Sequence, residues 1–216
     1  STTTGASDWR ADVMRNADAN PATDHAVRVA QGNLQVDLIK TNSLLKLSTG
    51  VVATLKSGAH ITLTADDIDF ASGINNVRGT GTLKLRANQL VWQYYLGTAA
   101  ENVDGYDYAE TTDTQRGVQA MYLSARDLSA IRDGFNRIEI GRSDIGNLMY
   151  LGDAKQTTAV KMNSNLTRAA NAQRSQFLDD AFFFADELYI AGDVRAPDNM
   201  LTFSARKLAV LGSNIK

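Results

Sequence analysis

Residues 62–70 read TLTADDIDF and residues 84–92 read KLRANQLVW, and the pattern they share recurs along the chain. Each copy has a large apolar residue, one spacer, alanine, two polar residues, and then isoleucine or leucine. Three further copies are found at residues 122–130 (YLSARDLSA), 183–190 (FFADELYI) and 202–210 (TFSARKLAV). Self-similarity of this kind is the sequence signature of a repeat architecture, so this motif decides which fold we expect.

The spacing of the alanines indicates the size of the repeat. Ala65 and Ala87 are 22 residues apart, and Ala185 and Ala205 are 20 residues apart. The spacings on either side of Ala125 are longer and correspond to several coils with insertions. A period of roughly 20 residues is typical of a β-solenoid, whose coils bury their inward side chains only against neighbouring coils. The alanine suits a corner, where a larger side chain would crowd the next coil.

Short alternating runs surround the motif. Residues 60–65 (HITLTA), 82–87 (TLKLRA) and 137–141 (RIEIG) alternate polar and apolar side chains, which predicts half-buried strands with one face towards a core. Turn signals such as Gly-Thr-Gly at residues 79–81 separate these runs. We therefore expect an all-β fold, with a β-solenoid domain over residues 34–216.

The N-terminal segment, residues 1–33, lies outside the repeat. Within it, residues 7–18 place Trp9, Val13, Met14 and Ala17 near one helical stripe, with Ser7 as the N-cap. An open solenoid end presents unpaired strand edges and exposed core. We therefore interpret this segment as a cap or a docking element.

Other interruptions fall within the solenoid. Residues 124–134 predict a short lateral helix, with Ser124 and Asp127 spaced as a capping box and Gly134 at the C′ position. Two polar stretches without a period are interpreted as insertions into coils, residues 98–119 and 163–176.

Composition narrows the class of protein. The 216 residues carry 22 basic and 24 acidic side chains, a net charge of −2 that gives no reason to expect nucleic acid as a partner. No apolar run approaches the ~20 residues of a membrane-spanning helix. The chain has no cysteine and only two prolines, as in secreted repeat proteins built from ladder-bonded strands. We expect an extracellular or cell-surface protein whose signal peptide has been removed.

The order of these elements resembles a known family. Residues 61–85 (ITLTADDIDFASGINNVRGTGTLKL) and 122–144 (YLSARDLSAIRDGFNRIEIGRSD) resemble the repeated module of very large bacterial exoproteins of the filamentous-haemagglutinin and autotransporter-adhesin type. Residues 177–212 resemble the closing strands of that module, so the resemblance covers about residues 34–216. It implies a right-handed parallel β-helix, a role in surface display, adhesion or fibre building, and no catalytic residue set.

A carboxylate cluster is the strongest candidate for catalysis. Hydrolases and lyases use grouped carboxylates with shifted pKa values, and here the group comprises Asp66, Asp67 and Asp69, with Arg78 or Lys84 on a neighbouring coil. The other copies carry Asn-Gln, Arg-Asp, Asp-Glu and Arg-Lys at the two polar positions. A position whose charge changes sign between copies is typical of a solvated turn residue. We therefore assign no catalytic residue and expect no enzyme activity.

Calcium is the strongest candidate among cofactors. The polar stretch 98–119 offers carboxylate ligands at Glu101, Asp104, Asp107, Glu110 and Asp113. It has neither EF-hand spacing nor a glycine-rich nonapeptide, so a solvated acidic loop is the favoured interpretation and no bound metal is expected. His25 and His60 are far apart and there is no cysteine, which argues against a zinc site.

Apolar and aromatic residues outside the predicted core are candidates for contacts with other molecules. In the run of three phenylalanines at residues 182–184, alternation directs the middle ring towards the core and leaves its neighbours to pack elsewhere. The full set of interface candidates is Trp9, Met14, Val27, Val29, Trp92, Tyr94, Tyr95, Tyr106, Tyr108, Phe182, Leu211 and Ile215.

Three functional hypotheses follow. The leading one is a non-catalytic structural subunit of a bacterial surface or extracellular assembly, which associates with itself through its solenoid ends into a filament or fibre. The second is a monomeric adhesin that binds a glycan or a cell surface through the aromatic region 92–108. The third is a polysaccharide-active β-helix enzyme centred on the aspartate cluster.

Overall fold

In the computed structural model, the chain forms parallel strands and one short helix within the part that the structure describes. That part comprises residues 7–8, 27–29, 31–38, 44–46, 50–70, 74–88, 93–97, 120–123, 125–144, 146–152, 175–191, 194–196 and 198–210.

The strands are, in chain order, β1 (Ser7–Asp8), β2 (Val27–Val29), β3 (Leu34–Asp37), β4 (Leu44–Lys46), β5 (Val52–Thr54), β6 (Ile61–Thr64), β7 (Asp67–Asp69), β8 (Val77–Arg78), β9 (Thr82–Arg86), β10 (Gln93–Leu96), β11 (Ala120–Leu123), β12 (Arg137–Gly141), β13 (Leu148–Gly152), β14 (Ser175–Gln176), β15 (Ala181–Ala191), β16 (Val194–Arg195) and β17 (Leu201–Val210). The helix is α2 (Ala125–Ala130).

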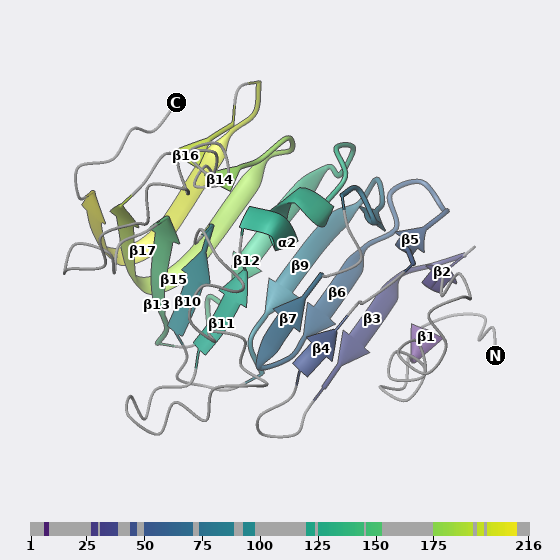
Figure 1. Cartoon of the computed structure of the whole chain (residues 1–216), viewed down its shortest axis with the longest axis horizontal. Coiled ribbons are helices and arrows are strands. Elements are labelled where there is room, and N and C mark those ends of the chain that lie inside the picture. The colour runs from purple at the N-terminus through teal and green to yellow at the C-terminus, as the bar shows by residue number, and fades with distance from the viewer. Residues whose placement is uncertain are drawn as a thin grey trace, which may run out of the picture.

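Neighbouring strands come from successive coils of the chain. Strands β1, β3, β6, β9, β12, the first half of β15 and the first half of β17 lie side by side, and we call them the first face. Strands β2, β5 and β8 form a separate three-stranded sheet. Each of these pairs is parallel, so the chain must circle back between paired strands instead of forming hairpins. Figure 1 shows the strands stacked along the long axis, with β3 towards one end and β17 towards the other.

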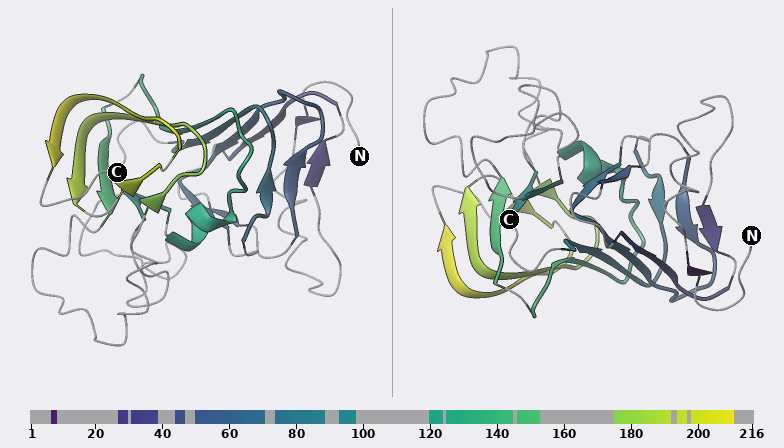
Figure 2. Two further views of the ribbon diagram at one scale, coloured as in Figure 1. Left: turned by 90° about the horizontal axis from the view of Figure 1, so that it is seen from above. Right: turned by 90° about the horizontal axis from the view of Figure 1, so that it is seen from below.

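The sheet curls because the long strands turn a corner. Residues 181–184 of β15 pair with β12, whereas residues 187–191 pair with β13. Both halves belong to one ten-stranded sheet, which Figure 2 shows as a half-barrel when viewed along its wall. The fold is therefore all-β, parallel and solenoid-like, as the repeat predicts.

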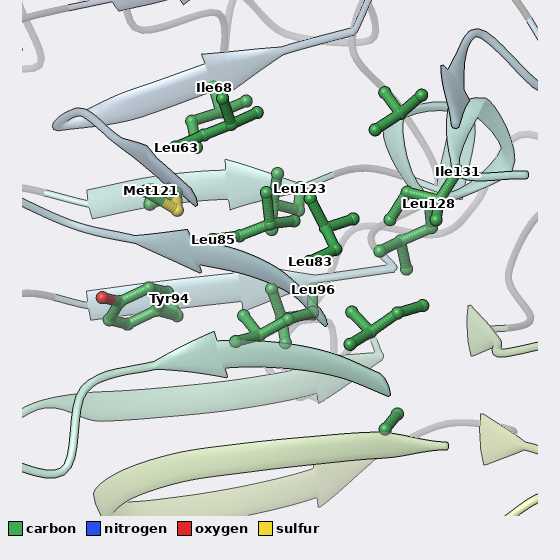
Figure 3. Packing of buried hydrophobic residues seen from close by; sticks show 14 of the residues in the cluster. Leu63, Ile68, Leu83, Leu85, Tyr94, Leu96, Met121, Leu123, Leu128 and Ile131 are labelled. Atoms are coloured by element: carbon green, nitrogen blue, oxygen red, sulfur yellow. The ribbon is translucent and has the colours of Figure 1, made fainter. Parts of the chain in front are cut away.

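Columns of apolar side chains hold the coils of the first face together. Stacked positions in neighbouring strands form two buried columns, Leu34–Ile61–Leu83–Ile138–Ala181 and Val36–Leu63–Leu85–Ile140–Phe183. Figure 3 shows Leu63, Leu85 and Leu123 pointing into one shared interior. Burial of a leucine or isoleucine side chain contributes roughly 1.5–3 kcal/mol, so these columns supply most of the driving force for stacking.

The predicted repeat is confirmed where its copies are one coil apart. Leu63 lies opposite Leu85, and Ala65 and Ala87 follow them at a corner, both fully buried. The copies at 183–190 and 202–210 also lie in register along β15 and β17. Phe183 is buried while both of its phenylalanine neighbours are half-buried, as alternation predicted.

The copy at residues 122–130 does not stack on the other copies, contrary to the prediction from the repeat. Leu123 pairs with Leu96 and not with the Leu85 column, and the chain then enters α2. The residue that stacks between Leu85 and Phe183 is Ile140, which belongs to a run without the alanine. The motif at 122–130 therefore repeats in sequence without occupying the repeated position in space.

A second face begins where each coil turns its corner. It contains β4, β7, β11, β10, β13 and the second halves of β15 and β17, in that spatial order. Here β11 lies beside β7, although β10 precedes it in the chain. On the first face only β9 separates β6 from β12, so the second face holds one strand more over the same interval. The chain thus steps back by one strand between β10 and β11.

Buried carboxylates accept hydrogen bonds from backbone amides beside this step. Asp67 Oδ1 accepts a hydrogen bond from Tyr122 N–H at 2.9 Å, and Asp127 Oδ1 accepts one from Phe70 N–H at 2.6 Å. Asp66, Asp67 and Asp127 are at most 3% exposed. The interpretation of Asp66 and Asp67 as solvated turn residues is therefore wrong, because they lie beside an interrupted strand ladder whose amides need acceptors.

The predicted lateral helix exists but is shorter, ending at Ala130. Asp127 Oδ1 accepts a hydrogen bond from Phe70 N–H in the preceding coil, and Ser124, the other residue of the predicted capping box, lies outside the described residues. Ile131 instead forms a parallel bridge with Val77. Gly134, predicted at C′, lies beyond the helix and donates its N–H to Asp179 Oδ1 at 3.0 Å.

The N-terminal segment takes part in the sheets at the positions described. Ser7, the predicted N-cap, and Asp8 form β1, which pairs with β3. Strand β2 pairs with β5. The rest of the predicted helix, and most of the predicted insertions at 98–119 and 163–176, lie outside the described residues.

Gly141 provides a test of coil packing. Its φ is 93°, and a Cβ atom there would lie 2.2 Å from Phe184 O in the next coil. Gly141→Ala is expected to lower the free energy of unfolding by at least about 1–2 kcal/mol, from the backbone conformation alone. Gly146→Ala is the control, because a Cβ there meets nothing within 4 Å, and it should change stability by less than about 1 kcal/mol. Equal stability of the two variants in urea denaturation would contradict this packing.

Candidate functional site

The candidate functional site is the outer edge of β17. Over nine residue pairs β17 runs parallel to β15, from Ala181↔Leu201 to Ile190↔Val210. Within the described part of the chain, no strand pairs with the other side of β17. An unpaired edge of this kind is a template for another strand.

Apolar side chains of β17 continue the core columns but remain exposed. Phe203 stacks on Phe183, with ring centroids 5.3 Å apart and planes at 19°. Phe183 is fully buried whereas Phe203 is only half-buried. In the second half of the strand, Leu208 covers the buried Leu188 and is itself 51% exposed. The core is therefore completed as far as β15 and left open at β17.

Hydrogen-bond directions show which amides of β17 face outwards. Ala181 N–H donates to Met200 O at 2.9 Å, so the even-numbered residues Thr202 and Ser204 direct their N–H groups towards β15. The backbone groups of a strand point alternately to its two sides. The backbone groups of Leu201 and Phe203 therefore point away from β15.

The corner of β15 shifts this alternation by one residue. The N–H groups of Asp186 and Glu187 both donate to Asn147 O, at 2.9 and 3.2 Å. Two successive residues thus face the preceding coil, and Leu188 is the next to face β17. By the same register on β17, Leu208 and Val210 direct their backbone groups away from β15.

Charged side chains on the convex side of the corner are paired within the chain. Arg206 makes two hydrogen bonds to Asp186, at 2.8 and 2.9 Å, and Lys207 Nζ lies 3.0 Å from Glu187 Oε2. The Arg206 bonds lower the pKa of Asp186, while the Tyr189 hydroxyl and then Lys207 lower the pKa of Glu187. The hydrogen bonds to Asp186 raise the pKa of Arg206, and those to the Tyr189 hydroxyl and then to Glu187 raise the pKa of Lys207. The two coils are thereby charge-neutralised against each other.

A tyrosine stack runs along the outside of the second face. Tyr122, Tyr95, Tyr150 and Tyr189 follow in that order, with successive centroids 5.0, 5.1 and 5.3 Å apart and planes within 18° of parallel. Lys207 Nζ lies 5.1 Å from the Tyr189 ring centroid and closes the stack. Both ring faces of Tyr95 are covered by its neighbours, so they are not available to stack on a sugar. The stack stabilises the coils against each other.

Two residues close the corner between coils from the inside. Tyr94 is fully buried, and its hydroxyl accepts a hydrogen bond from Ala87 N–H at 2.7 Å. Burial raises its pKa from 10.0 to about 12. Asn147 is also buried, and its amide donates to Phe184 O at 3.0 Å and accepts from Asp186 N–H at 3.1 Å.

Arg142 bonds the same corner from the outer side. Its Nη1 donates to Ala87 O and Asn88 O, at 3.3 and 3.4 Å, and its guanidinium forms two bonds with Asp144. The hydrogen bond from Arg142 lowers the pKa of Asp144 to about 2. These contacts tie the coil of β9 to that of β12.

The predicted catalytic group is only partly brought together. Asp66 and Asp67 are buried beside the β11 step, while Asp69 is half-buried. Lys84 lies on the first face and pairs with Glu139, at 3.2 Å. Arg78 Nε donates to Asn75 O at 2.7 Å. The basic residues of the predicted group thus have other contacts.

Several of the predicted site residues lie outside the described part of the chain. The weak calcium candidates Asp104, Asp107 and Asp113 fall outside the described residues, as do the interface candidates Trp9, Met14, Trp92, Tyr106, Tyr108, Leu211 and Ile215. Val27 and Val29 are in β2, without described side chains. Phe182 is half-buried, with the Arg137 guanidinium 4.9 Å from its ring centroid. Among the described residues there is no group of three potential metal ligands, and no helix has the length and apolarity to cross a bilayer.

Sequence reasoning placed interface candidates at Leu211 and Ile215, directly after this strand, and missed the residues within it because it treated all copies of the motif alike. The large apolar residues of the copy at 202–210 are Phe203, Leu208 and Val210, and Leu201 directly precedes that copy. The sequence signal that could have identified these residues is the pair of adjacent polar residues, Arg206 and Lys207. This pair marks a corner and so determines which side chains of the strand point inwards.

Comparison with family models, with curated proteins and with solved structures finds no match for this chain. The geometry of its residues therefore carries the functional argument.

Tyr94 supplies a test of the corner. Because its pKa is raised in the folded state, the stability it contributes is complete below pH 10 and is lost as pH rises towards about 12. Tyr94→Phe leaves the Ala87 N–H without its acceptor and should lower the free energy of unfolding by about 1–3 kcal/mol at neutral pH. The variant should also lose less stability than the original protein between pH 10 and pH 12. The measurement is the free energy of unfolding of both proteins, by urea denaturation, at several pH values between 10 and 12. Equal losses of stability in the two proteins would contradict the burial of the Tyr94 hydroxyl.

Proposed function

We propose that this chain is a non-catalytic structural module, a right-handed parallel β-helix that builds an extracellular or cell-surface assembly by pairing with itself through the open edge of β17. The observation that carries the proposal is a ten-residue strand whose outward backbone groups and apolar side chains continue the core without cover.

Addition of a strand at this edge would satisfy the outward backbone groups and cover Leu208 and Val210 at once. Both side chains are about half exposed, at 51% and 50%. Strand addition of this kind obtains affinity from main-chain hydrogen bonds and specificity from the side-chain pockets. The edge therefore offers a partner strand both kinds of interaction.

The edge lacks two of the usual protections against pairing, a proline and a free lysine side chain. Proteins protect exposed edges with proline, with bulges, or with lysine side chains that are free to obstruct a second strand. Residues 201–210 contain no proline. Their two basic residues, Arg206 and Lys207, are held on the convex side by carboxylates of β15. An edge that is long and apolar, without proline or a free lysine side chain, favours association.

The resemblance to modules of large bacterial exoproteins supports the location and the structural role. Those modules build surface fibres and adhesins from stacked coils and have no catalytic residue set. In this chain the covered ring faces of Tyr95 and the burial of Tyr94 favour a structural use of these aromatics over glycan binding.

A charge placed on the open edge tests the proposal. The original protein is expected to gain mass with concentration in light scattering, whereas Leu208→Lys should remain monomeric, because a lysine at a strand edge opposes pairing. Ile74→Lys is the matched control, since Ile74 is 72% exposed and lies in a turn away from β17. It should assemble like the original protein.

Circular dichroism would confirm that both variants retain their strands. The proposal is wrong if the original protein stays monomeric over the whole concentration series. It is also wrong if folded Leu208→Lys assembles as well as the Ile74→Lys control.

A further inference from the structure

We infer that the partner of β17 is the β17 strand of a second copy, paired antiparallel about a two-fold axis through the corner of the strand. This inference rests on the proposed function and adds the identity, direction and register of the partner strand. In this register Phe203 lies opposite Leu208 of the second copy, and Leu201 lies opposite Val210.

Apart from the central pair of Ala205 and Arg206, the side-chain pattern of β17 is the same when read from either end. Leu201 and Phe203 continue inward columns of the first face, and Leu208 and Val210 continue those of the second. A strictly alternating strand of even length would place its two end residues on opposite faces. The extra outward residue at the corner restores the match, so Leu201 and Val210 both face inwards.

The backbone follows the same symmetry. The residues whose backbone groups point away from β15 include Leu201 and Phe203 before the corner and Leu208 and Val210 after it. In an antiparallel ladder, residues that exchange both hydrogen bonds recur at every second position. Pairing of Leu201 with Val210 and of Phe203 with Leu208 meets this requirement on each arm of the strand, and the alternation shifts by one residue at the corner between the two arms.

The corner permits this arrangement in space. The two halves of β17 lie on different faces of the curled sheet, as Figure 2 shows for the yellow strand at the end of the stack. A two-fold axis that bisects the corner exchanges the two halves and keeps their inward sides together. The columns that end at Phe203 and Leu208 would then continue into those of the second copy. Such a contact is isologous, the commonest kind in homo-oligomers.

Charge does not oppose the pairing. In this register Lys207 lies opposite Ser204 of the second copy, and Arg206 lies opposite Ala205. Each base already has a carboxylate partner on β15 in its own chain. The two Lys207 positions are three residues apart along the ladder, about 10 Å, which is close to the Debye length at physiological ionic strength.

Head-to-tail stacking offers β17 a poorer match. The strands described at the opposite end of the two faces are β1 and β4, with two and three residues. Strand β17 has ten residues. A second β17 matches that length and the inward pattern together.

Disulfide trapping tests the register without background, because the chain has no cysteine. Ser204 and Lys207 of the second copy form an outward, non-hydrogen-bonded pair, whose Cα atoms would be about 4.5 Å apart, within disulfide range. We would prepare Ser204→Cys and Lys207→Cys as separate variants and mix them under mild oxidation. A covalent dimer is expected in the mixture, in large excess over either variant alone, since no residue in this register lies opposite itself.

Mixing Thr202→Cys with Lys207→Cys is the control, since these positions are offset by two residues and should yield far less dimer. Light scattering on the unmodified protein distinguishes a failure of this register from a failure of self-association. Concentration-dependent growth without trapping of the 204–207 pair would overturn this register and leave self-association standing. A protein that is monomeric throughout would overturn both.

Discussion

Hydrogen bonding between parallel strands is the constraint on which this structure depends. Each strand has backbone donors and acceptors on two sides, and a buried group left unpaired costs about 1–3 kcal/mol. Along the first face the requirement is met by the next coil, and apolar columns that include Leu63, Leu85 and Ile140 keep the register. A shift by one residue would turn every inward side chain outwards. The apolar columns and the ladders therefore specify the same arrangement.

The unusual features of the molecule are the places where that ladder is interrupted. At the step between β7 and β11, Asp67 and Asp127 supply acceptors for backbone amides. At the corner next to β9, the buried hydroxyl of Tyr94 does the same for Ala87. At the outer side of β17, no described residue meets the requirement. Interruptions between the described coils are closed by the chain's own side chains, and the open edge of β17 is where we place its function.

Much of the fold could be predicted from the sequence, because a solenoid repeats its environment at each coil. The period of about 20 residues correctly placed Phe183 opposite Phe203 and Ala185 opposite Ala205. The comparison of copies gave a wrong result for Asp67, which was interpreted as a solvated turn residue. A change of charge sign between copies does not reveal that the strand ladder beside one copy is interrupted. The reversed order of β10 and β11 was also beyond reach, because the sequence between them has no period and the local pattern does not specify where the next strand pairs.

The central claim is that the outer side of β17 is a pairing edge occupied by a second copy. Residue-resolved amide exchange over a concentration series tests it most directly. The amides of Thr202, Ser204, Lys207 and Ala209 bond to β15 and should be protected at every concentration. The account predicts that the amides of Leu201, Phe203, Leu208 and Val210 exchange rapidly when dilute and become protected as concentration rises. Rapid exchange of these four amides at every concentration would contradict it.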